Sequence, residues 1–395
     1  MSLLPIADAL DRLRALALPL PIVEMPLADA AGRLLAEDRS ALRTQPAADL
    51  SAMDGYAIRF AEAPGPWRVI GESAAGSPPG QVIAAGEAMR IFTGAPLPAG
   101  ADCVLVQEDA SRDGATVRMV GEGPPGPGAH VRRAGSEFTA GAPLLAAGDR
   151  LTAARIALAA VAGHGSLPVR RRPRIAIVST GDELVPPGAP VGPGQLPSSN
   201  AAMLAAMLAA WPVDIDDLGI VADDRTALRR TFEAAARSAD ILVTIGGASV
   251  GDHDLVRPAL ADTGAALDFW RVAIKPGKPL MAGRLGDAVL LGLPGNPVSA
   301  FVTATLFLLP LVAALIDDAA LLPGWRTLPL ARALPATGGR AEYLRARIVD
   351  GRAVPVGDQG SAGVIALAAA DLLIVRPPFA APALPGDSAE TLIIA

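Results

Sequence analysis

The only two lysines of this 395-residue chain lie three positions apart, in Lys275-Pro276-Gly277-Lys278-Pro279, and every other basic side chain is an arginine. Lysine is a compact charge with three rotating donors, whereas arginine is a broad planar fork. Two such charges on a loop stiffened by proline suit a small, highly charged oxyanion better than a flat carboxylate. The alternative is that codon bias left both lysines there by accident, and their spacing favours the oxyanion site.

Three further loops carry polar or glycine-rich turns directly after predicted strands, at residues 179–183, 246–254 and 294–299. We expect these loops and the lysine turn, residues 275–279, to lie at one edge of a parallel sheet, because open α/β sheets bind ligands beyond the carboxyl ends of their strands. Each turn alone is common loop chemistry. Four turns at one edge of one sheet indicate a ligand site.

Two of these loops offer backbone groups to a ligand. Asn296 followed by Pro297 is a good start for a helix, whose free N–H groups bind anions. Ser249 and the glycines beside it allow close approach to the backbone.

The carboxylates of Glu183, Asp223 and Asp254 are hard oxygen ligands of the kind that Mg²⁺ prefers, and Mg²⁺ commonly bridges phosphate oxygens. For Asp223 and its neighbour Asp224 an equally good interpretation is capping of a following helix. We expect His253 to be a loop residue and not a metal ligand. No Walker loop is present, since Lys278 precedes a proline, and no Gly-x-Gly-x-x-Gly follows the first predicted strand.

Composition excludes several classes of function. A net charge of −6 and a pI near 5.2 argue against general binding to nucleic acid or to an anionic membrane. The single Cys103 and three scattered histidines exclude a disulfide framework and disfavour a structural zinc site, which predicts a reducing, cytoplasmic location. Residues 298–316 are uncharged, but Pro310 and the preceding Pro-Gly-Asn-Pro turn favour a buried helix over a membrane span.

Periodicity predicts a multidomain fold, α/β plus β. Residues 1–45 and 143–172 are expected to form an N-terminal helical linker domain that is interrupted by a β-rich lid domain over 46–142. Residues 173–324 alternate strands (175–178, 241–245, 289–292) with helices (201–210, 226–239), which predicts a doubly wound parallel sheet. Short β patterns over 325–395 predict a small barrel or sandwich.

Six motifs occur in order along the chain: Ser-Ala-Met-Asp-Gly-Tyr-Ala from residue 51, Thr-Gly-Ala-Pro-Leu-Pro from 93, Ser-Thr-Gly-Asp-Glu-Leu from 179, Gly-Gly-x-Ser-x-Gly-x-x-Asp from 246, the lysine turn, and Pro-Gly-Asn-Pro-Val-Ser from 294. With them the chain resembles the molybdopterin molybdenumtransferase family, the molybdate-inserting enzymes of molybdenum cofactor synthesis that are related to the gephyrin E domain. The resemblance implies a central molybdopterin-binding domain and an elongated homodimer.

The resemblance also implies a role for each site residue. Asp54 and Thr93 would belong to the lid, although without the resemblance the better interpretation of both positions is an ordinary turn. Glu183 and Asp254 would hold Mg²⁺, with Asp223 close to the metal and the phosphates. The residues implied to bind molybdate or the rest of the substrate are Lys275, Lys278, Ser249, Asn296 and Ser299, with Arg340 and Ser361 from the C-terminal domain. The chain departs from the family pattern at Glu137, which follows Ser136 where the family often has an Asp.

The implied reaction inserts molybdate into adenylated molybdopterin and releases AMP. Two alternatives remain: a molybdopterin adenylyltransferase, which shares the central domain, and a non-catalytic dimeric scaffold of the same fold. A transient contact with the adenylyltransferase is a further implied partner.

Overall fold

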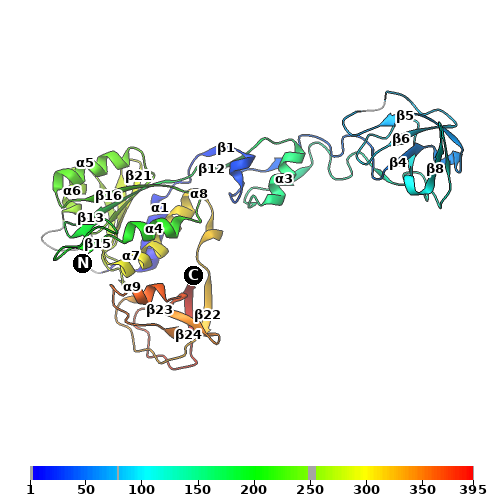
Figure 1. The fold of residues 1–395 in the computed structure, drawn as a ribbon. Coiled ribbons are helices and arrows are strands. Elements are labelled where there is room, and N and C mark those ends of the chain that lie inside the picture. Colours follow the sequence, from blue (N-terminus) through cyan, green and yellow to red (C-terminus); the bar gives the residue numbers. More distant parts are fainter. Residues whose placement is uncertain (1–2, 78–79, 248–254, 395) are drawn as a thin grey trace. The chain divides into compact units, whose positions relative to one another are not determined.

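The computed structural model describes residues 3–77, 80–247 and 255–394, which form two compact units. Unit 1 consists of Met1–Ile22 with Arg170–Ala395, and unit 2 of Val23–Val169 (Figure 1).

The centre of unit 1 is a six-stranded sheet. Its strands lie in the order β16 (Asp214–Val221), β13 (Arg174–Thr180), β17 (Ile241–Ile245), β21 (Ala288–Leu293), β20 (Met281–Leu285) and β18 (Ala266–Trp270). The first four strands are parallel, as predicted, whereas β20 is antiparallel to both of its neighbours, β21 and β18. The antiparallel pairing has a local cause, because only Gly286 and Asp287 separate β20 from β21, and Gly286 adopts a φ of +59° in this tight turn.

Helices cover both faces of this sheet (Figure 1). Ile175 and Ile177 of β13 pack in one core cluster with α1 (Ile6–Leu16) and α4 (Asn200–Leu208). The intervening Ala176 and Val178 pack in a second cluster with α5 (Arg225–Ala236) and α6 (Val256–Asp262). Because side chains alternate between the two faces of a strand, a run of apolar residues is buried on both sides. This confirms the doubly wound arrangement.

The apolar stretch near residue 300 is a helix in the core of unit 1. It consists of α7 (Pro297–Thr303), a π-helical turn (Ala304–Leu308) and α8 (Leu309–Ile316). By length and composition it could cross a membrane, but 83% of its apolar window is buried inside the protein. The prediction of a buried helix is confirmed.

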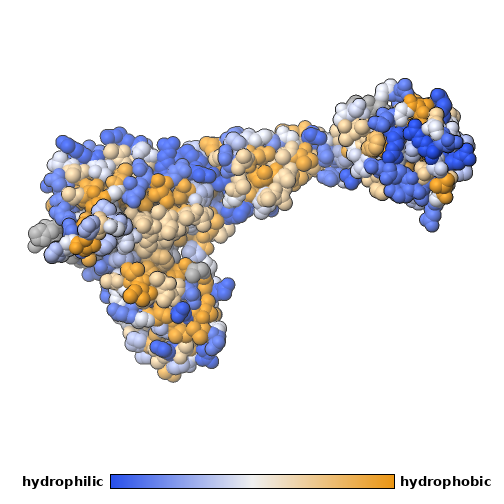
Figure 2. Space-filling model, viewed as in Figure 1, coloured by the Kyte–Doolittle hydropathy of each residue, from blue (hydrophilic) through white to orange (hydrophobic). Residues whose placement is uncertain are grey.

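The C-terminal part of unit 1 is a small β-barrel, as expected. Its strands are β22 (Trp325–Pro329), β26 (Ser388–Ile393), β25 (Leu372–Arg376), β23 (Ala341–Val349) and β24 (Arg352–Pro355). A bridge between Leu330, directly after β22, and Ala353 in β24 closes this path. The barrel also carries α9 (Val364–Ala368), where Val364 and Ile365 are exposed. Figure 2 shows apolar residues on the surface of this domain.

Unit 1 also contains three short strands outside the central sheet. β19 (Ile274–Lys275) joins the barrel by pairing in parallel with β23. Beyond β13, a small parallel pair, β14 (Leu184–Val185) and β15 (Leu196–Pro197), leads into α4.

Unit 2 contains the predicted β-rich module. Its six-stranded sheet has the order β7 (Cys103–Val106), β4 (Gly55–Ile58), β6 (Glu87–Ile91), β5 (Trp67–Ser73), β9 (Thr116–Met119) and β8 (Ala110–Asp113). The rest of unit 2 comprises α2 (Leu27–Ala30), α3 (Ala153–Ala162) and three strand pairs: β1 (Ile22–Pro26) with β12 (Ser166–Arg170), β2 (Arg39–Ser40) with β11 (Pro143–Leu145), and β3 (Leu50–Ser51) with β10 (Val131–Arg132).

The N-terminal segment differs from the expected helical linker. Its one long helix, α1, belongs to unit 1, where Ala9 and Leu13 enter the core of the central domain. The remainder up to residue 45 contains only the four-residue α2 and short strands. Pro19, Pro21 and Pro26 account for this, since proline lacks an N–H and clashes with the preceding helical turn. The four-domain boundaries proposed from the sequence stay a prediction.

Candidate active site

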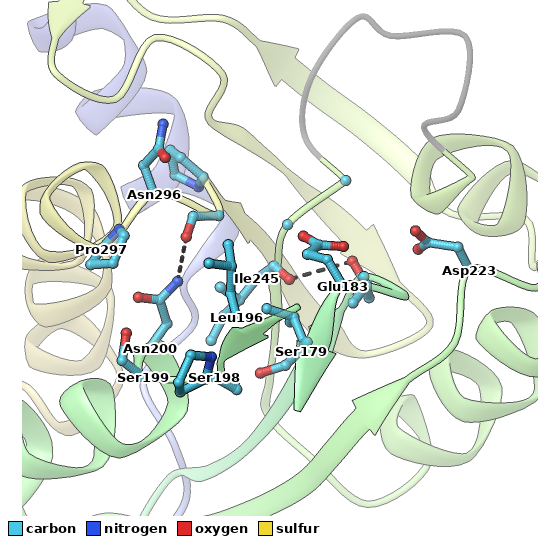
Figure 3. A pocket seen from close by; sticks show the side chains of 18 of the residues that line it. Ser179, Glu183, Leu196, Ser198, Ser199, Asn200, Asp223, Ile245, Asn296 and Pro297 are labelled. Atoms are coloured by element: carbon cyan, nitrogen blue, oxygen red, sulfur yellow. Dashed lines mark hydrogen bonds between the residues drawn. The ribbon is translucent and has the colours of Figure 1, made fainter. Parts of the chain in front are cut away.

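A cavity of about 680 Å³ opens at the carboxyl ends of the parallel strands in unit 1 (Figure 3). The chain leaves β13 for β16 on one side and returns to β17 on the other, so β13 and β17 flank the switch point where ligands bind in such sheets. Three of the four predicted loops contribute most of the lining of the cavity: Ser179, Thr180, Gly181 and Glu183 after β13, Gly246 and Gly247 after β17, and Pro294, Gly295, Asn296 and Pro297 after β21. These loops meet as predicted.

The glycines of these loops bring backbone against backbone. Gly246 has a φ of +94°, and a Cβ atom there would lie 2.7 Å from the carbonyl oxygen of Thr180. A Cβ atom at Gly295 would lie 3.6 Å from the Cα atom of Gly246. The floor of the cavity therefore has no room for a side chain at Gly246, whatever ligand it takes.

Carboxylates gather on one side of this cavity, where Figure 3 shows Glu183 and Asp223. The backbone N–H of Asp223 donates to Asp182 Oδ1 at 3.0 Å. Burial raises the pKa of Asp223, and the negative charges of Asp182 and Glu183 raise it further. Asp224 is the residue that caps α5, since its Oδ1 accepts the N–H of Ala227 at 2.7 Å. Capping thus explains Asp224 and leaves Asp223 at the cavity.

This carboxylate side is chemically suited to a divalent cation. Glu183 and Asp223 are hard oxygen donors whose mutual repulsion a cation would relieve. Among the residues that the structure describes, no three His, Cys, Asp or Glu side chains are arranged to hold a metal. The predicted ligand Asp254 and the predicted substrate residue Ser249 lie outside the described residues. The donor set within the described chain is therefore two carboxylates on the cavity wall.

The lysine turn lies in the connection between β18 and β20 of the central sheet, but β19, the short strand in which it begins, does not belong to that sheet. β19 pairs with β23 of the barrel in the register Lys275 to Glu342. Lys275 Nζ donates to Glu342 Oε1 at 2.9 Å, so this lysine is ion-paired. Lys278 is exposed, without an ion-pair partner in the described ranges. Only Pro279 of this turn lines the cavity.

Close packing fixes the lysine turn on the core helix. Gly277 has a φ of +109°, and a Cβ atom there would lie 2.5 Å from Thr303 Cγ2 of α7. Ser299, another predicted site residue, is buried on the same helix, and its carbonyl lies 3.6 Å from that Cβ position. The turn and the start of α7 therefore form one packed assembly.

Asn296 and Ser361 are brought together although they belong to different domains. Asn296 Nδ2 donates to Ser361 Oγ at 3.2 Å, and the N–H of Val298 donates to the carbonyl of Ser361 at 3.3 Å. The expected supply of free N–H groups at this helix start is thus partly wrong, because Pro297 has none and Ser361 occupies that of Val298. Arg340 directly precedes β23, and β23 is the strand whose Glu342 pairs with Lys275 of β19.

The predicted lid residues Asp54 and Thr93 lie in unit 2 and contact each other. The backbone N–H and the hydroxyl of Thr93 both donate to Asp54 Oδ1 at 2.7 Å, and these bonds lower the pKa of Asp54. The flanking strands β3 and β4 pair with other strands and not with each other, so Asp54 is not in a simple hairpin turn.

Two polar side chains of the cavity were missed as site residues by the sequence analysis. Asn200 is the first residue of α4, and its Nδ2 donates to the carbonyl oxygen of Gly295 at 2.6 Å (Figure 3). The preceding Ser199 makes no side-chain cap. Asn200 Oδ1 and Ser179 Oγ are buried without a partner among the described residues. The sequence signal available for them was their position, because Ser179 directly follows a predicted strand and Asn200 directly precedes a predicted helix.

An arginine pair at the same edge of the sheet was also missed. β18 runs parallel to β21, so Trp270 at its end lies on the cavity side. The guanidinium carbons of Arg257 and Arg271 lie 4.0 and 4.1 Å from the centroid of a Trp270 ring. This stack adds positive charge at that edge, and no spacing rule in the sequence connects its members.

Comparison with known proteins places the chain. Family models match residues 4–163 (MoeA N-terminal region, domain I and II), 176–314 (probable molybdopterin binding domain) and 327–394 (MoeA C-terminal region, domain IV). A molybdopterin molybdenumtransferase of Nostoc sp. is 40% identical over 74% of this chain and 69% of its own length, and one of Synechococcus elongatus is 35% identical over 88% of each. The chain belongs to the molybdopterin molybdenumtransferase family.

A solved structure agrees with this assignment. The molybdopterin biosynthesis MoeA protein of Pyrococcus horikoshii is 29% identical, with a TM-score of 0.83 over 99% of both chains. The family relationship confirms the resemblance found from the six motifs, the multidomain fold class and the classification of the protein as a transferase.

Proposed function

We propose that this transferase inserts molybdenum from molybdate into adenylated molybdopterin and releases AMP. The observation that carries the proposal is the meeting, within unit 1, of a carboxylate-lined cavity, the lysine turn and the Ser361 segment of the barrel. Neither alternative explains this arrangement as well. An adenylyltransferase needs only the central domain, whereas family matches also cover both flanking regions, and a scaffold has no need of the retained lysines and carboxylates.

The proposed chemistry is electrostatic. Molybdate, the phosphates and the dithiolene sulfurs are all negative, so mutual repulsion opposes their encounter. Lys278, Lys275 and Arg340 would lower this barrier on the oxyanion side, because positioned charges stabilise charge that accumulates in a transition state. Ser299 and Ser361 would complete that side, with Asn296 holding Ser361.

On the opposite side, Mg²⁺ held by Glu183 and Asp254, with Asp223 nearby, would supply positive charge to the phosphates. Asp54 and Thr93 would act from unit 2 as part of a lid, and Ser249 would contact the substrate through the glycine-rich loop. No protein nucleophile is required, in keeping with a Cys103 thiol that is fully buried and has its pKa raised to about 12.

We further propose that the enzyme acts as a cytoplasmic homodimer and receives its substrate during a transient contact with the adenylyltransferase. The lone buried cysteine and the family relationship support a cytoplasmic location. Light scattering should give twice the chain mass of 40.0 kDa. A single-chain mass at high concentration would exclude the dimer.

The deciding experiment is incubation of the purified protein with adenylated molybdopterin, Mg²⁺ and molybdate, with AMP release as the readout. Lys278→Arg keeps the charge but replaces a compact ammonium by a wider fork. Loss of a charge-assisted contact should cost about 2–4 kcal/mol of transition-state stabilisation, or roughly thirty- to a thousandfold in rate. High molybdate should partly rescue Lys278→Ala.

Arg347→Ala is the matched control, because it removes an exposed charge near the opposite end of β23. It should release AMP at the parental rate. If both Lys278 variants also match the parent under limiting molybdate, the lysine turn is not the oxyanion site.

A further inference from the structure

A fully buried arginine lies beneath the barrel loop that reaches the cavity. The side chain of Arg345, on β23, has 0% exposure. Its Nη2 donates to the carbonyl oxygens of Asp358 at 2.6 Å and Gly360 at 3.0 Å. Gln359 locks the same segment from the other direction, because its amide both accepts the N–H of Arg345 and donates to its carbonyl, each at 3.0 Å.

Packing alone does not explain this choice of residue. Arg345 Nε and Nη1 are buried without a partner in the described chain, and burial lowers the pKa of the guanidinium. Burying a guanidinium is costly, and among the described residues no carboxylate forms an ion pair with Arg345, although the charge of Asp358 opposes part of the effect of burial on its pKa. We therefore expect the loop that Arg345 holds to have a role in function.

The hydrogen bonds of Arg345 determine which way the loop presents its amides. In a trans peptide the C=O and N–H bonds point in opposite directions. Because the carbonyl of Gly360 faces Arg345, the N–H of Ser361 points away from it. That N–H has no hydrogen-bond partner among the residues described, while Ser361 Oγ is bound by the cavity residue Asn296 and Ala362 lines the cavity.

We propose that Arg345 is a positioning residue that aims the Ser361 backbone N–H at a tetrahedral oxyanion bound at the cavity rim. Its buried charge adds a favourable potential for the anion at the same place. The proposal rests on the proposed function, which makes molybdate the oxyanion, and adds to it a backbone donor and the residue that orients this donor.

The test compares Arg345→Met with Arg376→Met. Arg376 is a matched control in the same barrel, since it is also buried and donates through Nη2 to two carbonyls, of Pro335 and Ala381, in another loop. Losing a hydrogen bond to an anion weakens binding by about ten- to a hundredfold. Arg345→Met should raise the KM for molybdate by that factor and leave both kcat at saturating molybdate and the KM for adenylated molybdopterin near parental values.

Arg376→Met should lower the melting temperature by about as much as Arg345→Met does, because each change removes two hydrogen bonds to loop carbonyls. It should leave the KM for molybdate unchanged. An equal rise of that KM in both variants, or none in Arg345→Met, would overturn the proposal. If Arg345→Met does not fold, hydrogen–deuterium exchange on the parental enzyme decides, because molybdate should protect the Ser361 amide and an unprotected amide refutes the role. Parental AMP release separates these outcomes from a failure of the proposed function itself.

Discussion

Gly277 offers a direct test of the packed lysine turn. In Gly277→Ala the new methyl group would meet Thr303 Cγ2 at 2.5 Å, on a backbone with a φ of +109°. Holding a non-glycine residue in such a conformation costs about 1–3 kcal/mol, and overpacking typically costs another 1–3 kcal/mol. The sum, roughly 2–6 kcal/mol, is large against the stability of a domain, so the exposed turn should move off α7 instead.

We therefore expect Gly277→Ala to damage molybdate use more than stability. Displacement of the turn would move Lys278 from the place proposed for it beside the oxyanion, which should raise the KM for molybdate and slow AMP release. Chemical denaturation should show a loss limited to the contacts of the turn. Gly286→Ala is the matched control, because its φ of +59° imposes the backbone cost of about 1–2 kcal/mol while nothing lies within 4 Å of the new Cβ.

The clash itself can be removed separately. Thr303→Ser deletes Cγ2 but keeps the hydroxyl, which donates to the carbonyls of Ser299 at 2.7 Å and Ala300 at 3.2 Å. The double variant Gly277→Ala/Thr303→Ser should regain about 1–3 kcal/mol relative to the sum of the single changes, together with much of the molybdate affinity. Our reading of the turn is refuted if Gly277→Ala behaves like Gly286→Ala and the second substitution restores nothing.

Three further predictions follow from other contacts. Asp223→Asn should raise the melting temperature near pH 8, because the raised pKa of Asp223 means that its ionised form opposes folding. Melting curves should show that this gain in stability disappears as the pH falls toward 3.8, and the variant should release no AMP. Cys103 should resist iodoacetamide at pH 8 until the protein is denatured, since the thiol is buried and its pKa is about 12, and Cys103→Ala should keep its activity. Glu342→Gln should change the free energy of unfolding by under about 1 kcal/mol, because Lys275 is half exposed, yet lower the KM for molybdate by freeing that charge.

The strands and helices of the central domain were predictable because their signals are local. The apolar run 241–245 coincides with β17, and the predicted helix 226–239 overlaps α5 (Arg225–Ala236). The polar turns after β13, β17 and β21 could likewise be placed together, since parallel strands end at one edge of a sheet.

The position of the lysine turn could not be derived in this way. β19 is two residues long, too short for any period-two pattern, and it pairs with β23, a strand 67 residues further along the chain. Only the tertiary fold decides that Lys275 faces Glu342. The fully buried Arg345 was equally invisible, because an arginine in a strand is expected on the solvent side.

The contacts that assemble the site join distant parts of the sequence. Asn200 and Gly295 are 95 residues apart, and Asn296 and Ser361 are 65 residues apart. Contacts of such separation form only after long loops have closed, so their geometry depends on the folding of both the central domain and the barrel. Since Asn296 belongs to the central domain and Ser361 to the barrel, a shift between these two parts of unit 1 would separate the carboxylate side of the cavity from its oxyanion side. Activity should therefore be lost before either part unfolds.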